Sequence, residues 1–128
     1  MSAPLIMIVD DDTMIRSLLV STLPENGCEL VEAHSGSEAI EFLVAKPPDL
    51  VLLDWNMPGR SGAEVLDELK RRHPNVPVIV LTAEGREVSR ALAKALGAEV
   101  FMTKPFSPLR LLAEVERLLP QGLVEQTA

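Results

Sequence analysis

The sequence predicts an α/β fold in which helices cover both faces of a parallel sheet. Five short apolar runs alternate along the chain with segments whose apolar residues recur at helical spacing. Most of these runs show little polar alternation, which is typical of strands buried on both faces. Four of them lead directly into a polar residue with reactive chemistry. Because the carboxyl ends of parallel strands meet at one edge of a sheet, the pattern also predicts a functional site there.

The strands are expected at Leu5–Val9, Cys28–Ala33, Leu50–Leu53, Val76–Leu81 and Val100–Thr103. The second run alternates polar and apolar residues most clearly, which indicates an edge strand with one face toward water.

Five helices are expected between and after the strands, each with one apolar face. These faces comprise Met14, Ile15, Leu18 and Leu19; Ile40, Leu43 and Val44; Val65, Leu66 and Leu69; Val88, Ala91, Leu92 and Ala95; and Leu111, Leu112, Val115, Leu118 and Leu119. Capping signals mark three of the helix starts: Ser35 with Glu38, Ser61 with Glu64, and Ser107 with Pro108.

Length and composition indicate one domain over residues 1–128, with a core at about 5–119 and a short polar tail at 120–128. The formal charge of −7 disfavours nucleic-acid binding, which requires clustered Lys and Arg, and favours a basic protein partner. Cys28 is the single cysteine and is expected to be a small buried hydrophobe. The apolar run Leu5–Val9 is too short for a signal peptide or a membrane span, so a cytoplasmic location is expected.

Three aspartates, Asp10, Asp11 and Asp12, follow the first strand. Asp12 is expected to cap the first helix. The other two should lie beside Asp54, and clustered carboxylates repel one another strongly. A cation would relieve this repulsion, and oxygen ligands suit Mg2+ or Mn2+, with Mg2+ favoured at sites that handle phosphate.

Asp54 ends a central apolar run and precedes Trp55-Asn56-Met57-Pro58-Gly59. A turn or capping aspartate is common before Pro-Gly, but Ser61 already fills the downstream capping role. We therefore predict a nucleophile that attacks phosphorus and becomes an aspartyl phosphate.

Thr82 and Lys104 end or follow the last two strands. Alone, Thr82 is an ordinary β-branched strand residue, and most lysines are solvated. Beside a phosphoryl group, the threonine hydroxyl could donate a hydrogen bond present only in the modified state, and the ammonium could pair first with Asp54 and then with phosphoryl oxygens. The Lys104–Pro105 bond is a candidate cis peptide that would direct the lysine inward.

In order and spacing, these motifs resemble the receiver domain of two-component response regulators. The resemblance rests on four stretches: Val9-Asp10-Asp11-Asp12, Asp54-Trp55-Asn56-Met57-Pro58-Gly59, Leu81-Thr82-Ala83-Glu84 and Lys104-Pro105-Phe106. It covers about residues 5–119, and the second stretch is especially similar to the family's chemotaxis regulator.

The resemblance implies a flavodoxin-like doubly wound sheet of five strands in the order 2-1-3-4-5, with five helices. It implies that Asp54 accepts a phosphoryl group from a histidine kinase, a phosphotransfer protein or a small phosphodonor. Mg2+ would be held by Asp10, Asp11, Asp54 and the backbone carbonyl of Asn56. Such a protein is a signalling switch rather than an enzyme.

The resemblance further implies that Thr82 and Lys104 bind the phosphoryl group, and that Thr82 and the ring at Phe101 form the switch. The family often has tyrosine at the place of Phe101, so the ring is kept here without its hydroxyl. Asn56 and Glu84 occupy positions that influence loss of the phosphoryl group, and both favour quick self-dephosphorylation.

The readout is expected on helix four, strand five and helix five, toward a downstream protein or an output domain, with no membrane or nucleic-acid contact by this domain. Arg90, Lys94, Glu99, Arg110, Glu114 and Arg117 are available there. The sequence leaves open whether the receiver stands alone or belongs to a longer protein, and whether phosphorylation produces a homodimer.

Two other classes of protein share parts of this pattern. Haloacid dehalogenase-type phosphatases also use Mg2+ and an aspartyl phosphate, but their nucleophile follows the first strand and a second Asp lies two residues on, where this chain has Asn56. A flavodoxin-like cofactor binder would have a Ser-, Thr- and Gly-rich phosphate loop after strand one, where this chain has three anions.

Overall fold

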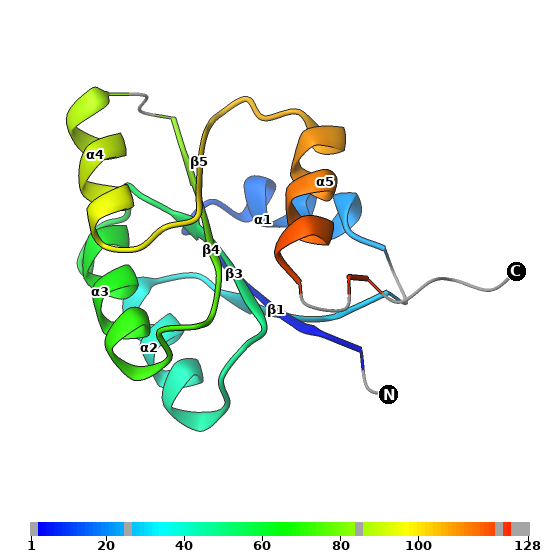
Figure 1. Cartoon of the computed structure of the whole chain (residues 1–128), viewed down its shortest axis with the longest axis horizontal. Coiled ribbons are helices and arrows are strands. Elements are labelled where there is room, and N and C mark those ends of the chain that lie inside the picture. Colours follow the sequence, from blue (N-terminus) through cyan, green and yellow to red (C-terminus); the bar gives the residue numbers. More distant parts are fainter. Residues whose placement is uncertain (1–2, 25–26, 84–85, 120–121, 124–128) are drawn as a thin grey trace, which may run out of the picture.

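The computed structural model describes residues 3–24, 27–83, 86–119 and 122–123. Within them, five parallel strands form one sheet in the order β2-β1-β3-β4-β5 (Figure 1). The strands are β1 (Leu5–Val9), β2 (Glu29–Ala33), β3 (Leu50–Asp54), β4 (Val78–Thr82) and β5 (Val100–Thr103). This confirms the α/β class, the strand order 2-1-3-4-5 and the edge position of the second strand.

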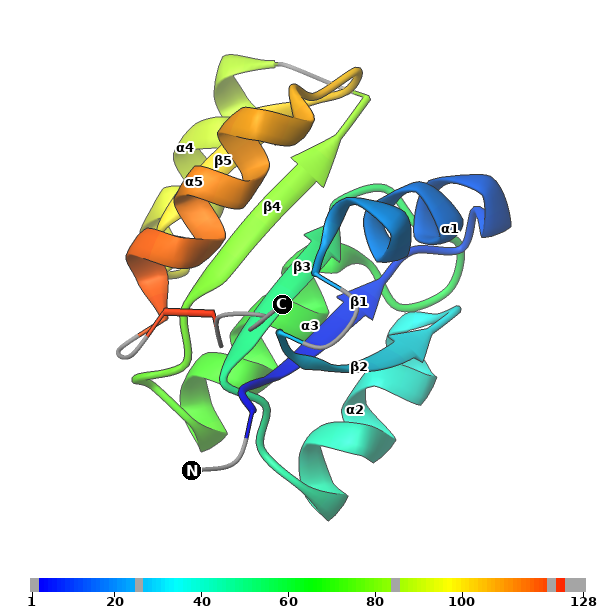
Figure 2. The same cartoon turned by 90° about the vertical axis from the view of Figure 1, so that its right-hand side faces the viewer.

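The five helices in this part of the chain are α1 (Thr13–Thr22), α2 (Gly36–Ala45), α3 (Gly62–Arg72), α4 (Glu87–Ala95) and α5 (Pro108–Leu118). Helices α1 and α5 lie on one face of the sheet, and α2, α3 and α4 lie on the other (Figures 1 and 2). None of the described helices is long and apolar enough to cross a membrane.

Two buried layers hold the helices to the sheet, because successive strand side chains point to opposite faces. In β1, Ile6 and Ile8 belong to the layer under α1 and α5. Met7 and Val9 belong to the layer under α2, α3 and α4. All four side chains are essentially inaccessible to water. A sheet covered on both faces explains why its strands read as continuous apolar runs.

The strand boundaries differ from the sequence prediction by one or two residues. β2 begins at Glu29 rather than Cys28, and β4 begins at Val78 rather than Val76. Pro77 lies before that start and has no N–H to donate to a neighbouring strand, which accounts for the later beginning. β3 and β4 also continue through Asp54 and Thr82, so these two site residues are the last residues of their strands.

Parts of the predicted helix faces are wrong. The expected face of α4 is turned outward, with Val88 78% exposed and Leu92 45% exposed, while Ala93 is fully buried. The small side chain of Ala93, rather than the most apolar stripe of α4, therefore faces the core. Met14, Leu18 and Val44 are also exposed rather than buried. By contrast, Val65, Leu66 and Leu69 of α3, and Leu111 and Val115 of α5, are buried as expected.

The predicted N-caps are confirmed. The side chains of Asp12, Ser35, Ser61 and Ser107 each accept a hydrogen bond from a backbone N–H in the first turn of a helix. These caps fix where four helices begin, and α1 and α3 begin next to the carboxyl edge of the sheet. The polar tail expected at 120–128 lies almost entirely outside the described residues.

Candidate functional site

Four of the predicted site residues meet at the carboxyl edge of the sheet. Asp10 follows β1, Asp54 ends β3, Thr82 ends β4 and Lys104 follows β5. Parallel pairing in register brings these strand ends level, with Asp54 opposite Leu81 and Thr82 opposite Thr103. The main-chain N–H of Lys104 also donates to the carbonyl of Thr82, at 2.7 Å. The sheet therefore brings together residues that are far apart in the sequence.

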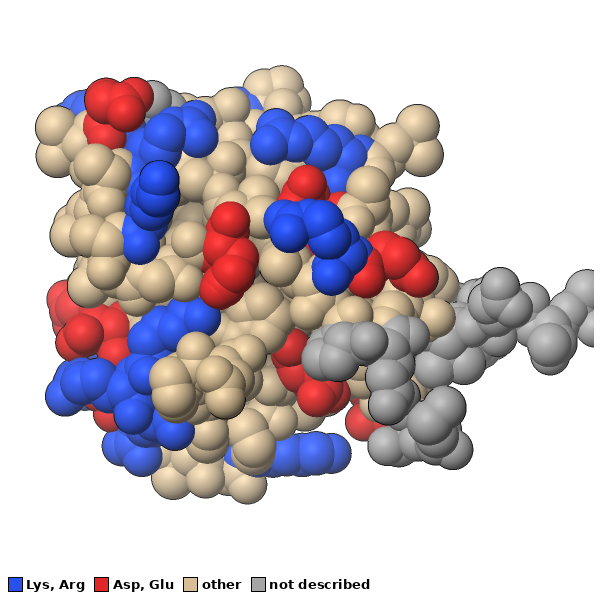
Figure 3. All heavy atoms as spheres, in the orientation of Figure 1, with Lys and Arg blue, Asp and Glu red and all other residues tan. Residues whose placement is uncertain are grey.

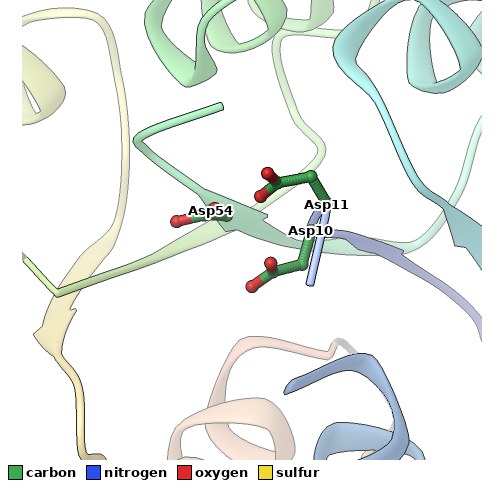
Figure 4. A group of neighbouring side chains, drawn as sticks. All are labelled: Asp10, Asp11 and Asp54. Atoms are coloured by element: carbon green, nitrogen blue, oxygen red, sulfur yellow. The ribbon is translucent and has the colours of Figure 1, made fainter. Parts of the chain in front are cut away.

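Three carboxylates form the anionic centre of this edge (Figure 4). Asp10, Asp11 and Asp54 each offer an oxygen, and these oxygens lie within 4.8 Å of one another. Asp10 and Asp54 are 1% and 5% exposed, whereas Asp11 is exposed to solvent. Buried carboxylates at this separation suit a hard divalent cation, and the exposed Asp11 leaves one side open to water.

Lys104 is the cation that contacts the two buried carboxylates. Its Nζ lies 2.8 Å from Asp10 Oδ2 and 3.4 Å from Asp54 Oδ1. The sequence predicted a pair with Asp54, and in the structure the shorter contact is with Asp10. Burial alone would lower the pKa of Lys104, but the hydrogen bond to Asp10 and the charges of Asp54 and Asp10 raise it above its ordinary value. The lysine is therefore protonated at neutral pH.

Asp54 holds its proton more tightly than an ordinary aspartate does. Burial is the main cause, and the negative charge of Asp10 adds to it. Together they raise the pKa of Asp54 from 3.8 to about 6, against the opposing effect of Lys104. One ammonium thus does not fully balance the carboxylates, and the site has affinity for further positive charge.

Thr82 is fully buried and its hydroxyl faces Asn56. The Nδ2 of Asn56 donates a hydrogen bond to Thr82 Oγ1, at 3.1 Å. This contact links the loop after the β3 carboxylate to the end of β4. The sequence suggested roles for both residues but not that they bond to each other.

The backbone at Asp54 is held by close packing with α3. The N–H of Gly62 donates to the carbonyl of Trp55, at 3.1 Å. A Cβ at Gly62 would lie 2.6 Å from the carbonyl oxygen of Asp54 and 2.7 Å from the Cα of Trp55. Only glycine allows this approach, so Gly62 is part of what positions the carboxylate. Trp55 itself is 7% exposed and packs into the layer under α2, α3 and α4.

Comparison with known proteins agrees with this arrangement. The family model of the response regulator receiver domain matches residues 6–116. The chain belongs to that family.

Among curated relatives, the phosphate regulon transcriptional regulatory protein PhoB of Pseudomonas aeruginosa is 40% identical over 116 residues, which is 89% of this chain and 51% of the relative. PhoB of Escherichia coli is 39% identical over the same length. The receiver domain chain thus spans about half the length of the curated relatives it matches.

Solved structures give the same picture. A CheY-like receiver domain protein from Methanospirillum hungatei has a TM-score of 0.87 and 28% identity, covering 94% of this chain and 97% of that one. The chemotaxis protein CheY4 of Vibrio cholerae has a TM-score of 0.84 and 30% identity, covering 92% of this chain and 100% of that one. The fold is that of CheY-like receiver domains.

Two further predicted features of this receiver lie in β5 and directly after it. Phe101 is half-buried in β5, and the guanidinium of Arg90 lies over its ring, 4.7 Å from the centroid. The Lys104–Pro105 peptide bond is cis. Glu84, predicted to tune dephosphorylation, lies outside the described residues.

One residue that the sequence did not single out also contacts the receiver site. Arg16 of α1 donates from Nη1 to the backbone carbonyl of Asp10, at 2.7 Å. No feature of the sequence pointed to Arg16, because an arginine in the second turn of a helix is usually solvated. Every residue type also has a backbone carbonyl, so a contact with one leaves no pattern in the sequence.

Proposed function

We propose that this receiver domain accepts a phosphoryl group on Asp54 and thereby switches a protein-binding surface. The observation that carries the proposal is the buried Asp54 carboxylate, which lies beside Asp10 and Asp11 and within 3.4 Å of the Lys104 ammonium. A carboxylate in this setting is a nucleophile held next to the charges that a phosphoryl group requires.

The oxygen donors fit a divalent cation. Asp10, Asp11 and Asp54, with the backbone carbonyl of Asn56, would hold Mg2+, and Mn2+ would also be accepted. A bound cation would offset the negative charge on both the acceptor and the phosphoryl group. The raised pKa of Asp54 supports this assignment, because burial and the charge of Asp10 destabilise the ionised carboxylate, and a bound cation would stabilise it.

In the reaction, an oxygen of Asp54 forms a bond to phosphorus while the bond from phosphorus to the donor breaks, and the donor keeps that electron pair. The donor would be the phosphohistidine of a sensor kinase or phosphotransfer protein, or a small acyl phosphate. Lys104 is already protonated and would pair with the new phosphoryl oxygens. Thr82, whose hydroxyl oxygen accepts a hydrogen bond from Asn56, would donate its hydroxyl proton to a phosphoryl oxygen.

The readout is proposed on α4, β5 and α5. Val88 and Leu92 expose apolar side chains on α4. On the face of the molecule drawn in Figure 3, Lys and Arg side chains are interspersed with Asp and Glu and do not gather into one basic patch. Apolar residues surrounded by mixed charges suit a downstream protein or a second receiver better than nucleic acid. Movement of Thr82 and of the Phe101 ring would couple the site to this surface. Asn56 and Glu84 are proposed to favour quick self-dephosphorylation.

The direct test is incubation with Mg2+ and acetyl phosphate, followed by intact mass measurement. We expect the mass of one phosphoryl group to be added to the wild type and to Asp67→Asn, an exposed control on α3, but not to Asp54→Asn. Trp55, the single tryptophan, adjoins Asp54 and should change its emission with Mg2+ and again with the phosphodonor.

An unmodified wild type under these conditions, in folded protein, would sink the proposal. Sustained hydrolysis of many phosphate esters, lost in Asp54→Asn, would instead support the alternative of a Mg2+-dependent phosphatase that forms an aspartyl phosphate.

A further inference from the structure

Arg16 makes contacts on two sides of the β1–α1 connection. Its side chain is only 15% exposed. Nη1 donates to the carbonyl oxygen of Asp10, at 2.7 Å, and Nε donates to Glu32 Oε1, at 3.3 Å. Glu32 lies in β2, one residue before the strand ends. The arginine therefore connects the backbone beside the carboxylate cluster to the edge strand of the sheet.

A second contact ties the same residue to the same strand. The main-chain N–H of Asp10 donates to the carbonyl of Ala33, at 3.1 Å. Ala33 directly follows Glu32, and the two pair with Val9 and Ile8 of β1. Asp10 is thus attached to the end of β2 through its own N–H and, through Arg16, by its carbonyl.

Fixing the carbonyl of Asp10 also determines how Asp11 leaves the strand. The carbonyl belongs to the planar peptide unit between Asp10 and Asp11, so holding its oxygen sets the orientation of the whole unit. Asp11 is exposed, and burial does not fix its backbone. Together with the hydrogen bond from the Asp12 N–H to Asp10 Oδ1, at 2.9 Å, the Arg16 contact therefore sets the orientation of this peptide, which directs the Asp11 side chain toward Asp10 and Asp54 or toward solvent.

We propose that Arg16, anchored by Glu32, is a positioning residue for the cation site. Its hydrogen bond to the Asp10 carbonyl holds the Asp10–Asp11 peptide so that both carboxylates face the same cation. This inference rests on the proposed function, because it assigns a role toward the metal that Asp54 chemistry requires. Groups outside the ligand shell commonly change metal affinity by tenfold or more when they orient the ligands.

The charge of Arg16 alone predicts the opposite effect. A guanidinium beside the site repels a divalent cation, so removing it without any structural consequence would tighten cation binding. If Arg16 orients the ligands, removing it weakens binding. The direction of the change in the dissociation constant thus separates positioning from simple electrostatics.

The experiment is a calorimetric titration of the metal-free protein with Mg2+ alone. We expect Arg16→Gln to raise the dissociation constant about tenfold. Arg16→Lys keeps the charge, but a single ammonium cannot reproduce the planar guanidinium that donates to both the Asp10 carbonyl and Glu32. It should therefore also weaken Mg2+ binding. Arg72→Gln is the matched control, because it breaks the exposed arginine–glutamate pair with Glu68 far from the cluster, and its dissociation constant should equal that of the wild type.

Glu32→Gln tests the anchor. Because Arg16 and Glu32 act together, the double variant with Arg16→Gln should bind Mg2+ no more weakly than Arg16→Gln alone.

Mg2+ affinity unchanged or tighter in both Arg16→Gln and Arg16→Lys would overturn the positioning role. If Arg16→Gln does not fold, Arg16→Lys decides alone. A wild type that binds no Mg2+ would overturn the cation site of the proposed function itself, which is a separate failure.

Discussion

Two groups of lysine and carboxylate side chains lie at opposite ends of the parallel strands, and they differ in net charge. Lys104 at the carboxyl edge and Lys70 at the amino edge are each 16% exposed. Lys104 faces Asp10 and Asp54 at 2.8 and 3.4 Å. Among the carboxylates in the described part of the chain, Lys70 contacts that of Glu99, at 2.8 and 3.1 Å, and it also donates to the carbonyl of Val76 at 2.7 Å.

The two groups differ in the number of carboxylates for each ammonium and in the hydrogen bonds that those carboxylates accept. At the amino edge one ammonium meets one carboxylate, and Glu99 Oε1 accepts a further hydrogen bond from the N–H of Val78. At the carboxyl edge one ammonium meets two buried carboxylates, with Asp11 close by. Glu99 directly precedes β5 and Lys104 directly follows it. β5 thus connects two groups of charged side chains. In the Lys70–Glu99 group the charges balance and the contact stabilises the sheet, whereas the Lys104 group has an excess of negative charge and can accept a cation.

The largest expected effect comes from neutralising one carboxylate at each edge. Because the folded protein raises the pKa of Asp54 from 3.8 to about 6, it binds that proton more tightly than the unfolded chain does. The protonated carboxyl therefore contributes about 3 kcal/mol to the free energy of unfolding below pH 4, and this contribution is lost as the pH rises through 6. Asp54→Asn should therefore stabilise the metal-free protein at pH 8 by up to about 3 kcal/mol.

Glu99→Gln is the matched change at the amino edge, where it should destabilise the protein by about 1–3 kcal/mol. Urea unfolding at pH 8 and pH 5 in the presence of a chelator measures both effects. The stabilisation by Asp54→Asn should shrink at pH 5. Destabilisation by both substitutions at pH 8 would contradict the proposed imbalance.

Removing the lysines should also separate the two edges. Lys70→Met and Lys104→Met should each cost about 2 kcal/mol at pH 8 without metal, because the first leaves the partly exposed carboxylate of Glu99, and the second the buried carboxylates of Asp10 and Asp54, without their ammonium. Mg2+ should restore the stability of Lys104→Met, since a divalent cation can replace the missing charge there. It should not restore Lys70→Met. Thermal unfolding with and without Mg2+ provides the comparison, and equal responses of the two variants to the metal would refute it.

Cation binding should depend on pH at the carboxyl edge. Mg2+ must displace the proton that Asp54 holds below a pKa of about 6. The dissociation constant should be constant above pH 7 and should rise toward tenfold per unit below pH 6, which is about 1.4 kcal/mol per unit. Titrations from pH 5 to pH 8 test this. Lys70→Met should keep the wild-type profile, and Asp54→Asn should lose the slope near pH 6.

The sequence predicted which residues meet at the site because each of them follows an apolar run, and parallel strands present their carboxyl ends together. It predicted the contact of Lys104 with Asp54 but not the shorter contact with Asp10, nor the hydrogen bond between Asn56 and Thr82. Lys104 and Asp10 are 94 positions apart, and their contact depends on how β1, β3, β4 and β5 stagger in space. The hydrogen bond between Arg16 and the Asp10 carbonyl was missed for a different reason, because any residue type supplies a carbonyl.

The helix faces illustrate a second limit. Periodicity identified α4 but assigned its apolar stripe to the core, whereas the structure buries Ala93 and exposes Val88 and Leu92. A hydrophobic stripe indicates that a surface is to be covered, but not whether the sheet or another protein covers it. The small residue that allows close packing carries little weight in a hydrophobic pattern.

The smallest expected effect concerns β5 between its two charged ends. Arg90 covers the ring of Phe101 at 4.7 Å, and a cation over an aromatic ring at an exposed site contributes about 0.5–1 kcal/mol. Arg90→Gln should destabilise the protein by this amount and leave the Mg2+ dissociation constant unchanged. If the ring must leave Arg90 when the site is phosphorylated, the same energy opposes the switch.

Arg90→Gln should then bind beryllofluoride, a phosphoryl mimic, about two- to fivefold more tightly in the presence of Mg2+, because the contact no longer favours the resting state. Lys94→Gln, on the same helix, is the control and should match the wild type. Equal beryllofluoride affinity in Arg90→Gln and wild type, despite the expected loss of stability, would show that the Phe101 ring does not leave Arg90 when the site is occupied. β5 would then connect the Lys70 and Lys104 groups without the Phe101 ring taking part in the switch.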